Sequence, residues 1–582
     1  MSIASELTAL NGYILGAYDE IDTKGGTVPA NKNMANLASA IGSISTGSST
    51  TITPLSVTEN GTYTAPAGTA YSPVTVNVSG GGDDQPEPKL TAYDNATGVL
   101  TGEGFGTSSG TVYVFDRMQN KDIPVATSSW SDTSITLSTP IDVANMVGTT
   151  STWVETSDEK ASNKIMVFGD IAVPGYGILY YTDNDGTVHS INMTESVELA
   201  RLATGNMETY ALIGGMNIWM GQIVGIQLAA KTTAVGSNFL KGCYNLVQPI
   251  DISHLTVMNG NFLDTCVNFN QPLDLSNLTS IGSSFLTACY SFNQPLDLSN
   301  ITSINTDFLY GCKAFNQPLD FSHKPSIGAY FLANCSKFNQ PLDFSGFTSI
   351  PGYLLQQCYA FNHPIDTSHV TSIGSGFLAG CYSFNHPLDI SNLTSIGSDF
   401  LNQCYAFNQP LDISNVTTIS SNFLKQCYGF DQPLDTSHLT TIGSSFLYGC
   451  SSFNQPLDLS GLTTIPNYFL YQCYSFDQPL DLSNITSINA YFMNGCRAFK
   501  HKIILGSGTV GNSFLYQSTN INEVDVGTTT PSSNNQTLAP YNVRARAYVD
   551  GVVLTGANAS TWVSTLPNIT NTPYRKLIDG TA

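Results

Sequence analysis

Charge is scarce in this sequence, and most of it is negative. Only 11% of the 582 residues are charged, and the 43 Asp and Glu outnumber the 21 Lys and Arg, so the formal net charge is −22. An acidic chain without a basic patch cannot release phosphate counterions, so we expect neither nucleic acid nor an anionic membrane as a partner. Apolar runs are short as well. None approaches the roughly 18 to 20 residues that span a bilayer, so we expect no membrane insertion.

Targeting signals are also missing from the sequence. The first 26 residues contain no basic segment followed by an apolar run, so we expect no secretory signal peptide. The last seven residues, KLIDGTA, contain neither a wall-sorting motif nor a hydrophobic tail. If the protein acts outside a cell, we expect it to leave by another route.

Clustered cysteine pairs of the C-x₂-C kind, which zinc sites need, do not occur. The twelve cysteines instead recur every 23 residues without insertion or deletion, which predicts a solenoid whose coils repeat one another. One Cys per coil is most simply a small buried hydrophobe. We predict free thiols, with disulfides between adjacent coils as the alternative, and neither a metal nor another cofactor. The cysteines are Cys243, Cys266, Cys289, Cys312, Cys335, Cys358, Cys381, Cys404, Cys427, Cys450, Cys473 and Cys496.

One unit, residues 292–314, shows the expected coil. The alternation of Leu296 and Leu298 predicts a short strand with both side chains pointing inward. The later group from Phe308 to Cys312 predicts a single helical or 3₁₀ turn that closes the coil. The fold class is therefore mainly β and multidomain, with a solenoid of twelve 23-residue coils over residues 237–518.

An aspartate also recurs in the coils. Stacked carboxylates about 5 Å apart repel by roughly 1 kcal/mol per pair even in water, so something must compensate. The D-x-[ST] pattern predicts that each carboxylate accepts hydrogen bonds from the following turn; cation binding along the ladder is the alternative. The ladder comprises Asp251, Asp274, Asp297, Asp320, Asp343, Asp366, Asp389, Asp412, Asp435, Asp458 and Asp481.

The position after each cysteine varies between coils, and residues that vary are better binding candidates than residues that repeat. A row of half-exposed tyrosines would offer apolar ring faces and hydroxyl groups to a sugar or a protein. The alternative is that Tyr only fills the groove between coils. Seven coils have tyrosine here: Tyr244, Tyr290, Tyr359, Tyr382, Tyr405, Tyr428 and Tyr474. The other five have Val267, Lys313, Ser336, Ser451 and Arg497.

The coils resemble two bacterial surface-repeat families. The I-G-x-x-F-x-x-x-C half, as in Ile281 to Cys289, resembles the BspA-like (treponemal-type) leucine-rich repeat. The F-N-Q-P-L half, as in Phe292 to Leu296, resembles a second family, whose slightly longer unit reads F-N-Q-P-L…V-S-N-V-T. The Trp and the Met-Phe pair of that family are missing here. The resemblance covers about residues 237 to 500. It implies a leucine-rich-repeat solenoid of the kind that serves many adhesins.

The segments before the solenoid carry further resemblances. Residues 1–47, with a helical pattern, and residues 48–80, with short strands, together resemble amino-terminal attachment segments of tail and baseplate-associated proteins of phages that infect Gram-positive hosts. Residues 81–89 are expected to form an acidic linker. Residues 90–173 resemble an immunoglobulin-like TIG (IPT) sandwich. Residues 174–236 are expected to form a β adaptor that caps the first coil, and residues 519–582 a C-terminal cap.

These resemblances imply a phage tail fibre or receptor-binding protein, located in the virion and assembled in the host cytoplasm. It would dock on the tail or baseplate through its N-terminal module and bind a host cell-surface glycan or protein through the solenoid. Analogy with tail fibres implies a homotrimer. A bacterial BspA-like adhesin is the alternative. We do not expect an enzyme, since no His/Ser/Asp grouping or carboxylate pair breaks the periodicity.

Overall fold

The structure is a computed structural model in which the chain divides into two compact units, Met1–Pro86 and Glu87–Ala582. Within the first unit it describes two paired antiparallel strands, β1 Gly61–Tyr63 and β2 Val74–Val76. The rest of the predicted attachment module and linker, and most of the predicted C-terminal cap, lie outside the described residues. Those residues are 61–63, 74–76, 88–203, 210–323, 325–518, 520–521, 523–525, 530–531 and 553–555.

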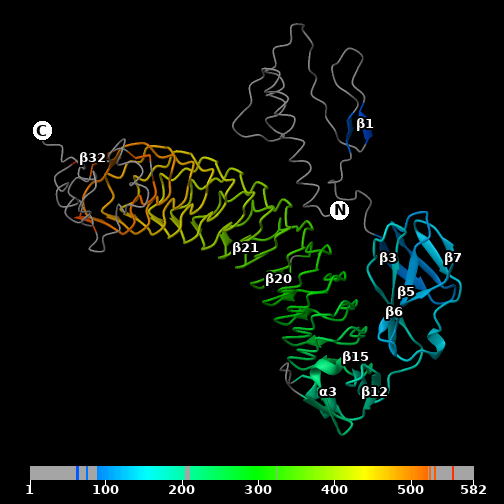
Figure 1. Cartoon of the computed structure of the whole chain (residues 1–582). Helices are drawn as coiled ribbons and strands as arrows, with labels where there is room; N and C mark the ends of the chain where they lie inside the picture. The colour runs from blue at the N-terminus through cyan, green and yellow to red at the C-terminus, as the bar shows by residue number, and fades with distance from the viewer. Residues whose placement is uncertain are drawn as a thin grey trace. The chain divides into compact units, whose positions relative to one another are not determined.

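The second unit begins with a β-sandwich (Figure 1). Two four-stranded antiparallel sheets, ordered β3-β4-β8-β7 and β10-β9-β5-β6, enclose one apolar core that includes Leu100 and Ile135 from the first sheet and Val112 and Val154 from the second. This two-sheet packing is the kind that the resemblance to a TIG domain implies; membership of that family stays a prediction. The strands are β3 Lys89–Asp94, β4 Val99–Glu103, β5 Thr111–Asp116, β6 Lys121–Val125, β7 Thr127–Trp130, β8 Ser134–Leu137, β9 Thr149–Glu155 and β10 Ile165–Phe168, with the 3₁₀ turn η1 at Val143–Asn145.

The next segment closes the N-terminal end of the solenoid. Its strand β15 is buried throughout, and the core residues of the segment, such as Met193, are continuous with those of the first coil. The N–H of Leu240 in that coil donates to the carbonyl of Leu202 at 2.9 Å. The segment therefore covers an apolar end that would otherwise be exposed. It comprises β11 Gly177–Thr182, β12 Val188–Met193, α3 Ser196–Arg201, β13 Tyr210–Ile213, β14 Met216–Trp219, η2 Met220–Gln222 and β15 Ile223–Leu228.

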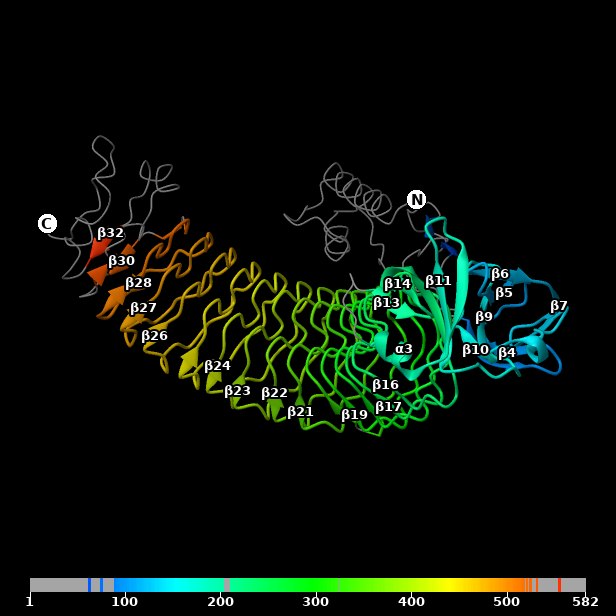
Figure 2. The same cartoon turned by 90° about the horizontal axis from the view of Figure 1, so that it is seen from below.

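The coils that follow confirm the predicted β-solenoid of 23-residue repeats, and each contributes one two-residue strand to a single edge (Figure 2). Paired strands run parallel and in register, so that Ile281 lies beside Ile304 and Ile304 beside Ile327. These strands are β16 Ala234–Val235, β17 Val257–Met258, β18 Ser280–Ile281, β19 Ser303–Ile304, β20 Ser326–Ile327, β21 Ser349–Ile350, β22 Ser372–Ile373, β23 Ser395–Ile396, β24 Thr418–Ile419, β25 Thr441–Ile442, β26 Thr464–Ile465 and β27 Ser487–Ile488. Beyond them lie β28 Ile503–Ile504, β29 Thr509–Val510, β30 Glu523–Asp525, β31 Thr530–Pro531 and β32 Val553–Thr555.

The strand predicted at Leu296 and Leu298 is in the wrong place. Both side chains point into the core, as predicted, but the strand of this coil is β19, five residues after Leu298. Pro295 has no N–H to donate to a neighbouring coil, and the Asp297 carboxylate accepts the N–H of Ser299 instead. The pairing therefore forms at the β-branched Ile304, where the backbone is free to extend.

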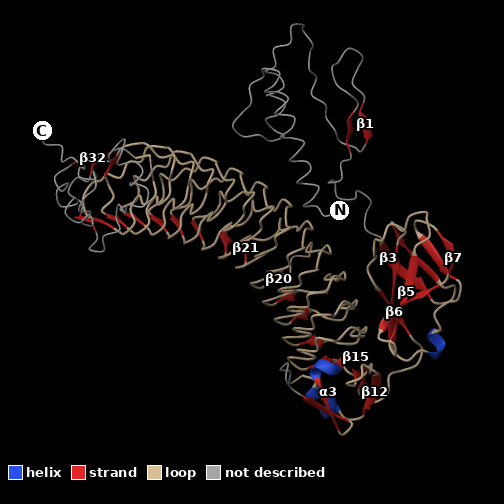
Figure 3. Cartoon of the chain, viewed as in Figure 1, coloured by secondary structure: helices blue, strands red, loops and turns tan. Residues whose placement is uncertain are grey.

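The helical or 3₁₀ turn predicted from Phe308 to Cys312 is also wrong, and among the described residues helix is confined to short segments before the solenoid (Figure 3). The backbone alternates in handedness, with φ of +61° at Asp307, +54° at Leu309 and +75° at Gly311. The N–H groups of Asp307, Leu309 and Gly311 donate to other coils, as when Leu309 donates to Phe285 at 3.0 Å. Those of Tyr310 and Cys312 donate to carbonyls of the same coil. A left-handed leucine costs roughly 1 to 2 kcal/mol, which burial of its side chain offsets.

The interior consists of side chains stacked from coil to coil. The ring of Phe315 lies 6.0 Å from those of both Phe292 and Phe338, centroid to centroid, and nearly parallel to them. A second column of phenylalanines contains Phe285 and Phe308, 5.7 Å apart. Each coil thus buries its apolar face against its neighbours, which a single coil cannot do alone. No helix among the described residues is long and apolar enough to cross a membrane.

Candidate ligand-binding surface

The repeated cysteines have a structural role. All twelve cysteines are buried and free, which confirms the predicted thiol ladder. From Cys266 to Cys496, each Sγ donates to a leucine carbonyl of the preceding coil at 3.0–3.1 Å. Burial raises the pKa of each thiol, as for Cys243 and Cys289. Since the thiolate is the reactive form, these groups should be chemically inert in the folded chain.

This inertness is testable with a thiol-specific aromatic disulfide reagent. We expect none of the twelve cysteines to react over an hour in native buffer and all twelve to react within minutes in guanidinium chloride. A cysteine introduced at the exposed Val257 is the control, because it should react in both conditions. Rapid reaction of several thiols in the native chain would contradict the buried ladder.

The repeated aspartates of the ladder have a structural role as well. In every coil of the ladder the Asp Oδ1 accepts the N–H of the residue two positions later at 2.8–3.1 Å, which confirms the predicted turn motif. These hydrogen bonds stabilise each carboxylate and so offset its repulsion by the carboxylates of the neighbouring coils. Hydrogen bonds from the serine hydroxyl and backbone N–H hold the carboxyl pKa below its ordinary value at Asp297, Asp320, Asp366, Asp412, Asp435, Asp458 and Asp481.

A pH dependence of stability follows. A carboxyl whose pKa is lower in the folded state stabilises the fold fully above its unfolded pKa of about 3.9, and this contribution is lost as pH falls from that value through the lower folded pKa. We expect the melting temperature to be flat from pH 7 to about 5 and to fall steadily toward pH 3. The double variant D297N/D320N keeps the acceptor oxygens and should show a shallower fall. A melting temperature that rose on acidification would refute this assignment.

Four of the seven candidate tyrosines form one continuous stack. The rings of Tyr359, Tyr382, Tyr405 and Tyr428 follow one another at centroid distances of 4.5, 4.4 and 4.8 Å, with interplanar angles of 13° to 20°. They come from four successive coils, so their spacing is that of the solenoid. We call this row, at the position after each cysteine, the tyrosine column.

The other three tyrosines of the column stand apart from that stack. Tyr244 lies edge-on to Trp219 of the capping segment, with ring centroids 5.5 Å apart. Lys313 Nζ lies 4.2 Å from the ring centroid of Tyr290, and the Arg497 guanidinium lies 4.9 Å from that of Tyr474. Each of these three rings therefore has a neighbour on one side. For the exposed Tyr290 and Tyr474 that neighbour is a cation.

Stacking changes what the column can offer a ligand. Inside the stack each ring covers its neighbour's face, so Tyr382 and Tyr405 present ring edges and hydroxyl groups. Only the two end rings have an outer face, and Ser336 beside Tyr359 and Ser451 beside Tyr428 are too small to cover it. Tyr359 and Tyr428 are accordingly 38% and 42% exposed. Apolar ring faces were expected along the whole row. They are exposed where another residue replaces tyrosine and interrupts the row.

A second group of tyrosines was missed by the sequence analysis. It occupies the positions two and five residues before the cysteine, and it is densest near the C-terminal coils. Tyr448 stacks on Tyr471 and Tyr468 on Tyr491, each pair at 4.6 Å, and Tyr468 meets Tyr471 edge-on at 5.6 Å. Both positions vary between coils, and that variation was the available signal. A smaller group comprises Tyr310, Tyr330 and Tyr353.

The sandwich covers part of another repeated position, the Gln of F-N-Q-P-L. Arg117 Nη1 donates to Gln248 Oε1 at 3.0 Å, Ser151 Oγ to Gln271 Oε1 at 2.7 Å, and the backbone N–H of Lys164 to Gln294 Oε1 at 2.7 Å. These three glutamines are buried. Burial lowers the pKa of Arg117 to about 10, so the guanidinium remains charged at neutral pH. The first three coils are thus committed to holding the sandwich.

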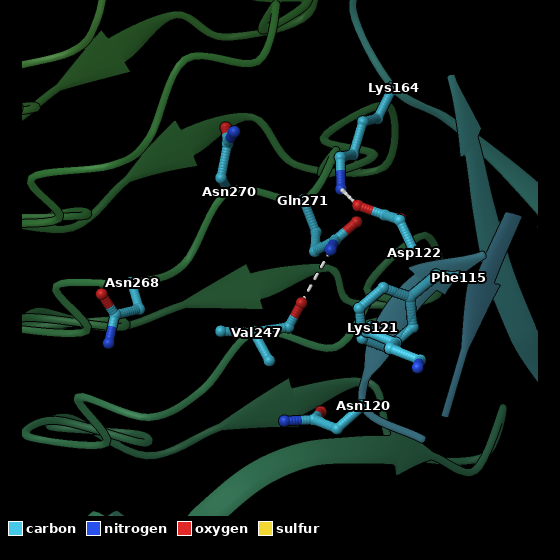
Figure 4. Close-up of a pocket in the computed structure, with 9 residues that line it drawn as sticks. All are labelled: Phe115, Asn120, Lys121, Asp122, Lys164, Val247, Asn268, Asn270 and Gln271. Atoms are coloured by element: carbon cyan, nitrogen blue, oxygen red, sulfur yellow. Dashed lines mark hydrogen bonds and ion pairs between the residues drawn. The ribbon is translucent and has the colours of Figure 1, made fainter. Parts of the chain in front are cut away.

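A crevice of about 350 Å³ lies at this junction (Figure 4). On the sandwich side Lys164 Nζ pairs with Asp122 Oδ2 at 2.9 Å, and on the solenoid side Gln271 Nε2 donates to the Val247 carbonyl at 2.7 Å. The second carboxylate oxygen of Asp122, Oδ1, is buried without a hydrogen-bond partner. No group of three metal-ligating side chains occurs here or elsewhere in the part of the chain that the structure describes.

Comparison with known families agrees with this geometry. The family model for the BspA type leucine rich repeat region (6 copies) matches residues 220–316, 316–431 and 417–539. The chain belongs to the BspA-type leucine-rich repeat family. In this BspA-type array the inward Phe and Leu of each coil and its Cys repeat almost unchanged. The position after the cysteine and the positions two and five residues before it vary. The tyrosines of the column and of the second group lie at these variable positions.

Two solved structures are similar to the BspA-type array. A leucine-rich repeat protein from Bacteroides ovatus is 14% identical, with a TM-score of 0.41 over 69% of this chain and 98% of that one. A leucine-rich repeat protein from Eubacterium ventriosum is also 14% identical, with a TM-score of 0.26 over 46% of this chain and 86% of that one. The search of curated proteins found no match.

Proposed function

We propose that this protein binds a bacterial cell surface through the outer face of its solenoid. The observation that carries the proposal is that tyrosines gather in stacks at the variable positions around each cysteine, whereas the buried Phe and Cys of the coils repeat. Many weak contacts, one per coil, suit a repetitive target such as a cell-wall polysaccharide, because linked contacts multiply in affinity. Membership of the BspA-type family supports the same general role.

Within that role we propose a phage tail fibre or receptor-binding protein. The support is the resemblance of residues 1–80 to phage attachment segments. That module would dock on the tail or baseplate in the virion, the sandwich would hold the first coils, and the remaining coils would meet the host. Assembly in the host cytoplasm and homotrimerisation follow from the same analogy. A host glycan or protein would be the receptor, and no catalytic step is required.

A bacterial BspA-like adhesin is the second candidate, and the family match favours it directly. Both candidates bind a surface and differ in where the chain resides. Antibodies against the solenoid should label purified virions at the tail if the first is right and intact producer cells if the second is right. Labelling of cells without labelling of virions would exclude the tail fibre.

Surface binding itself is tested with the full chain, fluorescently labelled, on intact cells of candidate hosts. We expect saturable binding that the unlabelled chain competes away, and loss of at least about tenfold in affinity for the double variant Y405A/Y428A. The matched control is Y210A, which truncates a 65% exposed tyrosine of β13 in the capping segment, outside the tyrosine stacks of the solenoid. Saturable binding to none of the hosts, or binding indifferent to the tyrosine column, would count against the proposal.

A further inference from the structure

The tyrosine column is interrupted at Ser451. The preceding coil places Tyr428 at this position and the following coil places Tyr474. Tyr405 covers one face of Tyr428 at 4.8 Å, and Arg497 covers one face of Tyr474 at 4.9 Å. On the side of Ser451 neither ring has an aromatic or cationic partner in the described coils. The two rings are 42% and 39% exposed, so two tyrosine faces border one missing ring.

The width of this break favours one kind of ligand. Neighbouring rings in the column lie 4.4 to 4.8 Å apart, so rings that skip one coil stand roughly 9 Å apart. Carbon atoms in contact lie about 3.5 to 4.0 Å apart, so a flat aromatic ring would need only about 7 Å. A puckered, saturated six-membered ring is thicker, and at roughly 4.5 Å from each tyrosine it would touch both faces through its C–H groups.

Polar groups surround the break where a sugar would need them. Ser451 is half-buried at its base, with Oγ 3.2 Å from the Tyr428 carbonyl, to which it donates. Tyr448 precedes Ser451 by three residues in the same coil. Burial, and then the phenols of Tyr468, Tyr428 and Tyr474, raise the pKa of Tyr448. The Ser451 hydroxyl, whose proton goes to the Tyr428 carbonyl, can accept a hydrogen bond from a sugar hydroxyl, and the Tyr448 phenol can donate or accept one.

The other breaks in the column lack this arrangement. At Val267 the base is branched and apolar, and Tyr244 on one side leans on Trp219 of the capping segment. Beside Ser336 stands Lys313, whose Nζ lies over the Tyr290 ring. Among the coils that the structure describes, Ser451 alone has a tyrosine directly on each side and a small hydroxyl residue between them.

We propose that the break at Ser451, walled by Tyr428 and Tyr474 and flanked by Tyr448, binds one pyranose ring of a surface glycan. The proposal rests on the surface-binding function above and names its ligand class and its position. The two tyrosine faces hold the C–H surfaces of the ring, and the surrounding hydroxyls select its orientation. The neighbouring coils would contact the rest of the glycan chain.

The test is to fill the break. The substitution S451Y places at this position the residue that four consecutive coils already carry, so it should extend the stack and leave the urea unfolding midpoint unchanged or higher. We expect affinity for a bound oligosaccharide to fall at least about tenfold. The matched control is S336Y, the same substitution at the other end of the four-ring stack, which should change affinity less than about twofold.

The probe is an array of oligosaccharides built from hexoses, 6-deoxyhexoses and N-acetylhexosamines, used with the full chain and each variant. The proposal is overturned if the wild-type chain binds no pyranose on the array, if S451Y binds as the wild type does, or if S336Y loses binding equally. Cell binding is scored separately. If wild type and S451Y bind host cells equally, the sugar site is wrong and surface binding stands. If the chain binds the array but no cells, surface binding is wrong and the sugar site stands.

Discussion

Replacing Phe315 with alanine is expected to lower the free energy of unfolding of the surrounding coils by about 3 to 5 kcal/mol. The ring is fully buried and stacks at 6.0 Å on both Phe292 and Phe338. Its removal takes contacts from two coils at once. The neighbouring rings cannot close the space, because the register of each coil is held by backbone hydrogen bonds on both sides. Urea unfolding and hydrogen exchange of the coil amides would measure the loss.

Two variants bracket this expectation. F315L keeps most of the volume and should cost less than about 1.5 kcal/mol. V257A alters a side chain that is 49% exposed and should change stability by no more than about 0.5 kcal/mol. Because stability in a repeat array is a sum of local terms, hydrogen exchange should rise most in the two coils next to Phe315. An F315A chain that lost less than about 1 kcal/mol would show that the column can repack.

Replacing Arg117 with methionine is expected to release the sandwich from the first coils. The guanidinium donates to Gln248 Oε1, to the Pro249 carbonyl at 2.8 Å and to the Thr149 carbonyl at 2.8 Å through Nε. Hydrogen bonds from a charged donor contribute about 1.5 to 3 kcal/mol, and the acceptors left behind are buried. We expect the junction to weaken by roughly 2 to 4 kcal/mol, while each part keeps its own core.

The junction is best followed locally. Hydrogen exchange should increase in β9, which holds Thr149 and Ser151, and proteolysis should become faster between the sandwich and the solenoid. The control K89M removes an exposed cation of the same sandwich and should leave both unchanged. If R117M behaves as K89M does, the glutamines alone hold the sandwich and the role given to Arg117 is wrong.

Periodicity accounts for what the sequence predicts well here. A 23-residue repeat without insertions leaves few options besides a solenoid, and any residue constant in every coil has to serve the stack. The buried thiols and the aspartate turn motif both follow from that reasoning. The strand was misplaced because inward alternation at Leu296 and Leu298 reports burial, whereas pairing also needs an N–H that Pro295 lacks.

Periodicity cannot predict features that differ between residues of the same type at the same position of the repeat. Gln248, Gln271 and Gln294 read the same as later glutamines in the array, yet these three are buried against the sandwich. The repeat does not reveal this burial, because its cause is contact with Arg117, Ser151 and Lys164, more than a hundred residues away. Likewise, a row of tyrosines indicates exposure but not that stacking hides most of the ring faces.

The constant 23-residue register has a genetic consequence. Unequal recombination between the coding segments of two coils would remove or add whole coils and restore every Cys, Phe and Asp contact at the new joint, as long as the first three coils stay with the sandwich. Each such event would shift the C-terminal end by about 4.8 Å and could bring a different outward residue beside Tyr428 or Tyr474. Coil number can therefore vary between lineages more freely than coil length, and with it the reach and spacing of the outer surface.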